Sequence, residues 1–237
     1  MMKGLIHYHF VNYSRTHKYI PPVSVFIIML LLNYASVPNP IMYSYSFTSL
    51  MLFFIMGWFT ITVLHAEDGV QKQITTLHTK KKKRYYLALI INCAIIGLIL
   101  SLIAVAYPIV FHSFGPKVQI IHIVTGLLAH FSLAVLSISL SLFFTRDLVK
   151  THVNSWWGVT GILIASLAMA VAQTKILSIK LLAWLLPPIR YVLEITMVDD
   201  KITQLPATVY IQFGWIFIYS LILMIIYIAI VSKRSIL

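Results

Sequence analysis

Six long apolar runs, separated by short polar connections, dominate this sequence. A helix needs ~20 apolar residues to cross the hydrocarbon core of a bilayer, and a helix satisfies its backbone groups internally there. The expected spans cover residues 20–37, 41–65, 86–111, 118–144, 156–173 and 207–231. The sequence therefore predicts an all-α, polytopic membrane protein in which residues 1–237 form a single transmembrane domain.

The composition is typical of a protein that lies mostly in lipid. Of the 237 residues, 60% are hydrophobic and only 10% are charged, whereas soluble domains carry about 25% charged residues. The net charge of +12 comes from cations near the ends of the runs, so membrane topology explains it and no nucleic-acid partner is expected. The single cysteine, Cys93, excludes an internal disulfide and a cysteine-clustered metal site.

The segment before the first run is basic and aromatic. Aromatic residues gather at membrane surfaces, so we expect an interfacial helix over residues 1–19. A disordered basic tail is the alternative. One face of this helix would carry Ile6, Phe10, Tyr13 and His17. The residues that can face water are Lys3, Asn12, Arg15 and Lys18.

Residues 176–193 interrupt the regular pattern before the last span. They are apolar but include Lys180, Arg190 and the pair Pro187-Pro188. Because a proline pair breaks helix hydrogen bonding, we expect two re-entrant half-helices that dip into the membrane and return. A seventh span is the alternative.

The distribution of charge predicts the orientation. With six spans, one side of the membrane receives 13 cations and three acids, and the other receives five cations and three acids. Cytoplasmic connections are rich in Lys and Arg. Both termini and the loop over residues 66–85 are therefore expected in the cytoplasm. A seventh span would place the Lys233-Arg234 tail outside, which fits this rule less well.

The loop over residues 66–85 has the most distinctive pattern. It opens with Glu67-Asp68-Gly69, in which Asp68 and Gly69 are also ordinary residues for a helix start. Val70, Ile74 and Leu77 follow at the spacing of one helical face. A basic cluster closes the loop, and we expect it to anchor the span and attract anionic lipid. The cluster consists of Lys80, Lys81, Lys82, Lys83 and Arg84.

The chain lacks the signatures of common enzymes and of self-powered transporters. It has no phosphate-binding loop, no His-Glu-x-x-His and no Gly-x-Ser-x-Gly. The expected spans hold no acidic residue, which argues against ion coupling through a buried carboxylate. The pairs His7–His9 and His122–His130 lack the further ligands of a metal site. We expect no catalytic residue, cofactor or metal on this chain, so any transport needs energy from another protein.

The layout as a whole resembles the type-2 ABC exporter permeases. In that family a Glu followed by Gly comes after the second span, and a short helix and a basic, aromatic segment then lead into the third span. Glu67-Asp68-Gly69, residues 77–84 and Tyr85-Tyr86-Leu87 stand in that order here. The interfacial helix, the six spans and the half-helices before the last span extend the resemblance to the whole chain.

The resemblance implies the membrane subunit of an ATP-driven exporter in a bacterial cell membrane. Two permease copies, as a homodimer or a heterodimer, would pair with two separate ATPase subunits that hold ATP and Mg. The cargo would be hydrophobic or amphipathic, such as a peptide, an antimicrobial or a lipid-like molecule. The half-helices would cap the outer side, with Pro187 and Pro188 as an outer gate.

In this family the helix around Val70 to Thr79 would be the coupling helix that sits in a groove of the ATPase. The residues implied in coupling are Glu67, Asp68, Gly69, Val70, Gln73, Ile74 and Leu77. Polar contacts would come from Gln71, Gln73, Thr75 and Thr76.

Two other classes of protein remain open. An intramembrane lipid transferase or protease would need polar catalytic residues at membrane depth. The cluster available for this is His130 with Ser132, Ser137, Ser139 or Ser141, and no carboxylate accompanies it. A non-transporting membrane scaffold is the other class.

Overall fold

A computed structural model describes residues 2–79, 81–149, 151–176, 186–197, 199–201 and 204–233. These residues form helices joined by short connections, and no strand occurs among them; Asn39 and Phe114 form an isolated bridge. The all-α prediction is confirmed. The helices are α1 Met2–Arg15, α2 Ile20–Asn33, α3 Ile41–Leu64, α4 Gly69–Thr79, α5 Lys82–Val110, α6 Ile120–Ser141, the 3-10 helix η1 Leu142–Phe144, α7 His152–Ile176, α9 Ile189–Thr196 and α10 Ala207–Lys233.

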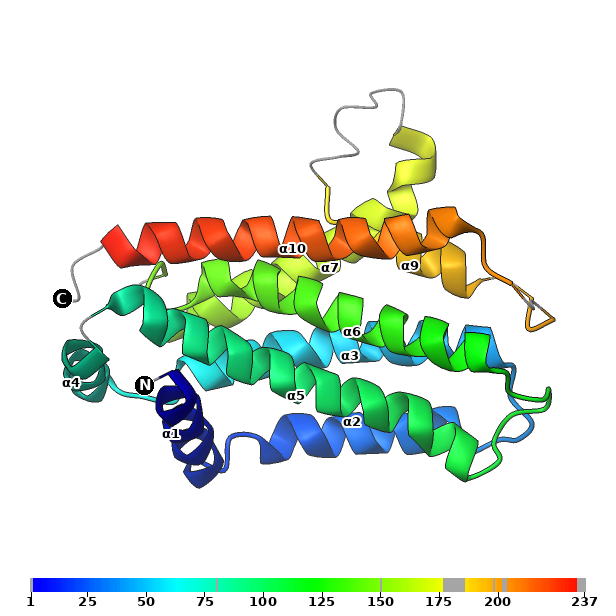
Figure 1. Cartoon of the computed structure of the whole chain (residues 1–237), viewed down its shortest axis with the longest axis horizontal. Coiled ribbons are helices and arrows are strands. Elements are labelled where there is room, and N and C mark those ends of the chain that lie inside the picture. Colours follow the sequence, from blue (N-terminus) through cyan, green and yellow to red (C-terminus); the bar gives the residue numbers. More distant parts are fainter. Residues whose placement is uncertain are drawn as a thin grey trace.

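Five of these helices are long and apolar enough to cross a membrane, which indicates a multi-pass membrane protein. They are α3, α5, α6 continued by η1, α7 and α10. The expected first span is shorter than predicted, because α2 has 14 residues and ends at Asn33 rather than at residue 37. At 1.5 Å per residue α2 rises about 21 Å, although it runs beside the other helices of the bundle (Figure 1).

The centre of the bundle is the packing of α3 against α6. Both helices have most of their side chains buried, whereas α7 and α10 lie at the periphery. The ring of Tyr45 lies where a Cβ on Gly126 would come within 2.8 Å, so the missing side chain lets the two helices approach. Ser137 of α6 donates a hydrogen bond to the Phe53 carbonyl of α3 at 2.5 Å. Small residues and interhelical hydrogen bonds are the usual means of holding helices together in lipid.

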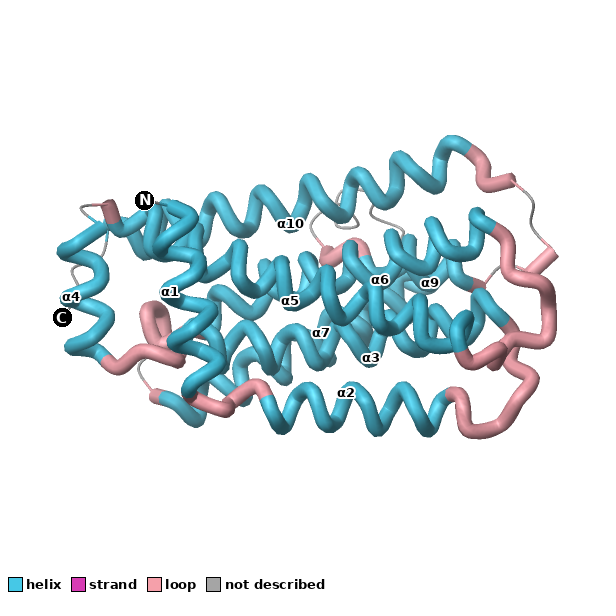
Figure 2. The backbone as a smooth tube through the Cα atoms, turned by 60° about the horizontal axis from the view of Figure 1, so that its bottom comes forward, coloured by secondary structure: helices cyan, strands magenta, loops and turns pink. Residues whose placement is uncertain are grey.

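Helix α1 forms where the interfacial helix was expected, but a different face of it is buried. It lies across the bundle rather than along it (Figures 1 and 2). The buried stripe is Leu5, His9 and Tyr13, and Phe10 is exposed. Tyr13 lies on both the expected and the buried face, and its hydroxyl forms a 2.8 Å hydrogen bond with Thr62 of α3. Leu5 and His9 complete the buried face in place of Ile6 and Phe10, and His9 packs against Tyr85 of α5.

The segment expected to be re-entrant is described only in part, because residues 177–185 lie outside the described residues. After Pro187 and Pro188 the chain forms α9, which has eight residues and is too short to span a membrane. Ile189, Val192 and Ile195 are buried, and α9 packs among α3, α6, α7 and α10. A short helix thus follows the proline pair, and the re-entrant path over residues 176–193 stays a prediction.

Candidate functional site

Helix α4 lies at one end of the bundle, beside α1 and the beginning of α5 (Figures 1 and 2). The C-terminal end of α10 lies at the same end, and α9 lies toward the opposite one (Figure 1). Asp68 accepts a hydrogen bond from the Gln71 N–H at 2.7 Å, so it caps the first turn of α4 as its position predicted. Gly69 is the first residue of the helix, and a side chain there would meet no atom within 4 Å.

Glu67 lies in the protein rather than on the exposed turn, with 7% of its surface accessible. Its Oε2 accepts a hydrogen bond from the Tyr85 hydroxyl at 2.6 Å, and its Oε1 accepts a longer one from Thr75 at 3.4 Å. His9 Nδ1 of α1 lies 3.6 Å from Oε1. Burial lowers the pKa of His9 to about 4, so this imidazole is neutral at pH 7 and makes a polar contact rather than an ion pair.

Lys72 is the second residue that ties α4 to the bundle. It forms an ion pair with Asp147, which lies between η1 and α7. Its ammonium group also lies 5.1 Å from the ring centroid of Tyr86 and 5.8 Å from that of Tyr85, a favourable placement for a cation over aromatic rings. Asp147 in turn accepts from the Tyr227 hydroxyl of α10 at 3.4 Å. One lysine thus connects α4 with three other parts of the chain.

Helix α1 supplies further contacts to the same face of α4. Gln71 Nε2 donates to the Tyr8 hydroxyl at 3.0 Å, and that hydroxyl lies 3.4 Å from Thr75 Oγ1. Thr76 is buried. Three of the four polar residues expected to contact a partner therefore face the protein, and Gln73 is the one that stays exposed.

The opposite face of α4 is apolar and exposed. Val70, Ile74 and Leu77 have 68%, 52% and 77% of their surface accessible. The predicted helical face is real, but nothing among the described residues covers it. Helix α4 is therefore two-sided, with a polar face fastened to the bundle and an apolar face that points away from it.

The basic cluster continues from α4 into the first turn of α5. Lys80 lies outside the described residues, and α5 begins at Lys82 rather than at residue 86. Lys81, Lys83 and Arg84 are exposed. Cations at a helix N-terminus oppose the helix dipole, so they are unfavourable for α5 itself and favour a nearby anion.

Charge is distributed unequally between the two ends of the bundle. At the α4 end lie α1, the start of α5, the end of α10 and neighbouring connections (Figure 1), and these segments carry ten described cations, namely Lys3, Arg15, Lys18, Lys72, Lys81, Lys82, Lys83, Arg84, Arg146 and Lys233. The connection before α6, helix α9 and the connection before α10, toward the opposite end, carry three, namely Lys117, Arg190 and Lys201. The sequence analysis used such an asymmetry to predict the cytoplasmic side, and that orientation stays a prediction.

The opposite end is held by a different set of contacts. Asp200 accepts hydrogen bonds from the backbone N–H groups of Ile41 and Met42 at 2.9 and 2.8 Å, so it caps α3. Pro187 and Pro188 are both buried at the beginning of α9. The Asn39 N–H donates to the Ser113 carbonyl at 2.9 Å, which joins two of the connections.

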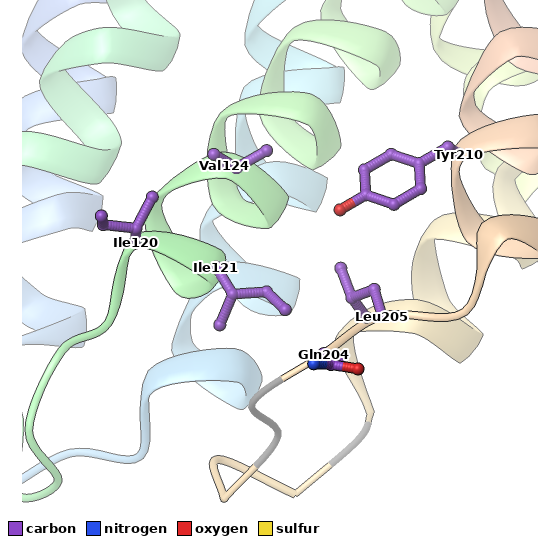
Figure 3. Close-up of a pocket in the computed structure, with 6 residues that line it drawn as sticks. All are labelled: Ile120, Ile121, Val124, Gln204, Leu205 and Tyr210. Carbon is purple, nitrogen blue, oxygen red and sulfur yellow. The ribbon is translucent and has the colours of Figure 1, made fainter.

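A pocket of about 450 Å³ opens between α6 and α10 near this end. Figure 3 shows the Tyr210 ring of α10 reaching toward the first turns of α6. Apolar side chains make up most of the lining, which consists of Ile120, Ile121, Val124, Gln204, Leu205 and Tyr210.

The polar cluster around His130 is occupied by structural hydrogen bonds. His130 Nδ1 lies 2.7 Å from the Gly126 carbonyl, and Nε2 lies 2.9 Å from Thr48 Oγ1. A carbonyl can only accept, so Nδ1 carries the proton and Thr48 donates to Nε2. Ser132 and Ser139 donate to carbonyls of their own helix. His130 and Ser137 thus bond to α3, Ser132 and Ser139 bond within α6, and Ser141 Oγ is buried without a hydrogen-bond partner among the described residues.

Histidines do not gather into a metal site among the described residues, where no group of three metal-ligating side chains occurs. His9 is buried while His7 is exposed. His122 Nδ1 accepts from the Gln119 N–H at 3.1 Å, so it caps its own helix.

The sequence analysis missed the residues that hold α4, which are His9, Lys72, Tyr85, Asp147 and Tyr227. One signal was present, because Lys72 is the single cation between Gly69 and Leu77 and does not share the helical face of Val70, Ile74 and Leu77. Its partner Asp147 lies 75 positions away, so spacing along the sequence could not pair the two residues. Comparisons with known protein families, curated proteins and solved structures found no match to this chain.

Proposed function

We propose that this chain is the membrane subunit of an ATP-driven exporter of the type-2 ABC class, with α4 as the coupling helix that docks on a separate ATPase subunit. The observation that carries this proposal is the two-sided α4. Its apolar residues Val70, Ile74 and Leu77 are exposed, while Lys72 and Glu67 fasten it to the bundle. ATP and Mg would be held by the ATPase and not by this chain.

A coupling helix has to be both docked and rigidly attached. Switching between two states requires an element that moves as a body rather than a loop that bends. Glu67 links α4 to Tyr85 of α5, Lys72 links it to Asp147, and Gln71 links it to Tyr8 of α1. Movement of α4 by an ATPase would thus be transmitted to α1, α5 and α10.

The same proposal assigns the topology. Helix α2 would be the first of six spans, completed by its flanking residues, and both termini would lie in the cytoplasm. The cation-rich α4 end would face the cytoplasm of a bacterial cell, where the basic cluster would contact anionic lipid. Two copies of the chain, or this chain and a sister permease, would pair with two ATPase subunits.

The cargo would be hydrophobic or amphipathic and would leave the cell. The pocket between α6 and α10 supports an amphipathic cargo, because its lining combines apolar side chains with the polar groups of Gln204 and Tyr210. Pro187, Pro188 and α9 would form the outer gate, since both prolines are buried at the start of α9 and α9 lies toward the end of the bundle opposite α4 (Figure 1).

The proposal is tested by purifying the tagged chain from native membranes in mild detergent and identifying what accompanies it. We expect a stoichiometric ATPase with a phosphate-binding loop. Leu77→Asp should abolish this association, because it places a charge on the exposed apolar face. Met197→Asp, at an apolar position beyond α9 that is 68% exposed against 77% for Leu77, should leave the association unchanged. Absence of an ATPase after gentle cross-linking would overturn the proposal.

A further inference from the structure

A cluster of positive charge surrounds the residue that follows α3. This residue, His65, is buried. The Lys18 ammonium group donates to the His65 carbonyl at 3.2 Å, and the backbone N–H of Arg146 donates to His65 Nε2 at 2.9 Å. The ring of His152 lies 5.8 Å from that of His65. The fold therefore gathers Lys18, Arg146 and His152, which come from three separate parts of the chain, around one point.

The positive charges of this cluster are not neutralised by the protein. Among the described residues, neither Lys18 nor Arg146 forms an ion pair with a carboxylate. Asp147, which follows Arg146 in the chain, is paired with Lys72 instead. Burial, and after it the positive charges around the ring, lower the pKa of His65 to about 3. Cations held close together repel one another, so an anion among them would be stabilised.

The three side chains also have hydrogen-bond donors to offer. Lys18 uses one of its three N–H groups on the His65 carbonyl, and Arg146 has a hydrogen bond from its backbone but none from its guanidinium group among the described residues. The Trp156 N–H donates to His152 Nε2 at 3.4 Å, so Nδ1 carries the proton of the neutral ring and can donate. All three residues are exposed. A ligand can therefore reach the cluster from solvent.

The cluster lies at the level where helices enter the membrane. Lys18 precedes α2 by two residues, and His152 is the first residue of α7, which is long and apolar enough to cross a membrane. Trp157 in the second turn of α7 is exposed, and tryptophan is enriched at the level of the lipid headgroups. A phosphate group of a neighbouring lipid would therefore lie beside the cluster.

We propose that Lys18, Arg146 and His152 bind a phosphate monoester, the group that forms the head of phosphatidic acid. A phosphate monoester carries about −1.5 to −2 charge at pH 7 and has three strong acceptor oxygens, so each of the three side chains can donate to an oxygen of its own. The phosphate diester of phosphatidylglycerol has two free oxygens and one charge, which leaves one donor unused. The nearby lipid makes phosphatidic acid the expected source, and a soluble phosphate monoester has the same chemistry.

A bound phosphate would neutralise the cluster and would join the connection between α1 and α2 to the beginning of α7. This inference does not rest on the proposed function, because none of the three side chains belongs to the exposed apolar face of α4. A chain that never meets an ATPase would bind the phosphate equally well.

The test is native mass spectrometry of the purified full chain in detergent, titrated with phosphatidic acid, phosphatidylglycerol or phosphatidylcholine of the same acyl chains. We expect phosphatidic acid to bind ~10-fold more tightly than phosphatidylglycerol, the effect of one further hydrogen bond between charged groups. Arg146→Gln should remove most of this preference, and it keeps the backbone bond to His65. Lys18→Gln should do the same. If Lys18→Gln fails to fold without its bond to His65, Arg146→Gln at its exposed position decides.

The matched control is Arg15→Gln, because Arg15 is an exposed cation that does not belong to the cluster. This variant should keep the full preference. Equal binding of phosphatidic acid and phosphatidylglycerol, or an equal loss in Arg15→Gln, would overturn the proposal in favour of a general charge effect. Glycerol 3-phosphate, which has the monoester without the acyl chains, distinguishes the two sources. If it displaces phosphatidic acid, the site takes a soluble phosphate monoester, and if it does not, the site takes the lipid.

Discussion

Lys72 of α4 and Asp147 form an ion pair across 75 positions of the chain, and both side chains are less than one-fifth exposed. The pair joins α4, whose apolar residues Val70, Ile74 and Leu77 are exposed, to the connection between η1 and α7. Because the two charges are partly shielded from water, removal of one leaves the other poorly solvated. The rigidity of α4 should therefore depend on this pair more than on an ordinary surface ion pair.

The first prediction concerns the attachment of α4. Lys72→Met should weaken it by about 2 kcal/mol, the range for a hydrogen bond to a charged group. Amide hydrogen exchange over residues 69–79 should then accelerate ~30-fold. Lys81→Met, which removes an exposed cation nearby, should leave exchange unchanged. The charge swap Lys72→Asp with Asp147→Lys should restore part of the protection from exchange. Exchange over residues 69–79 that stays unchanged in Lys72→Met would contradict the role given to the pair.

The second prediction concerns Glu67. In Glu67→Lys the assembled transporter should still hydrolyse ATP but should no longer transport cargo. The reason is that a second buried cation near Lys72 would repel it and move α4 away from Tyr85. Tyr85→Phe removes one hydrogen bond and should cost only about 1–2 kcal/mol of stability, with partial coupling retained. The measurement is cargo moved per ATP in proteoliposomes. Asp199→Lys, which changes an exposed acid toward the opposite end, serves as the control. Normal coupling in Glu67→Lys would contradict the assignment of α4 as the coupling helix.

The third prediction separates the helical form of α4 from its apolar face. Ile74→Pro should abolish coupling, because proline within a helix costs about 3 kcal/mol. Ile74→Ala keeps the helix and removes apolar contact area. It should weaken binding of the ATPase by ~10-fold while transport per ATP is preserved. Binding is measured by titrating the purified ATPase into the detergent-solubilised chain. Equal effects of the two substitutions would show that helical form and apolar surface cannot be separated.

The fourth prediction is a pH dependence that arises at His9. Burial lowers the pKa of His9 to about 4 from its ordinary 6.5, so the unfolded chain binds a proton there more readily than the folded one. Stability should be complete above pH 6.5 and should fall as the pH drops toward 4, by about 3 kcal/mol at most. The groups that face His9 are Glu67, Tyr85 and Tyr8.

Thermal unfolding of the solubilised chain from pH 8 to pH 5 measures this effect. His9→Phe should reduce the loss of thermal stability between pH 8 and pH 5. His65, whose pKa is lowered to about 3 by burial and neighbouring cations, should account for further loss at low pH. His7→Phe should follow the unaltered chain because His7 is exposed. A profile that is identical in His9→Phe would show that His9 does not carry the dependence.

Apolar runs predicted six spans, and five of them correspond to helices that are long and apolar enough to cross a membrane, because hydropathy over ~20 residues is a local property of the chain. The predicted span over residues 20–37 failed in length, since α2 stops at Asn33 before the Pro38-Asn39-Pro40 turn. The start of α5 was also misplaced. The run of cations was interpreted as part of a loop, whereas Lys82 to Arg84 form the first residues of α5. Both errors concern element ends, where hydropathy changes gradually.

By itself the sequence determined the all-helical membrane fold and the apolar spacing on α4, because both follow from which residues stand near one another along the chain. Only the tertiary structure decided that Glu67 is buried against Tyr85, that Lys72 meets Asp147 and that Leu5, His9 and Tyr13 form the buried face of α1. These contacts join residues far apart in the sequence. Their geometry depends on how the helices rotate and pack, and no local spacing specifies that rotation.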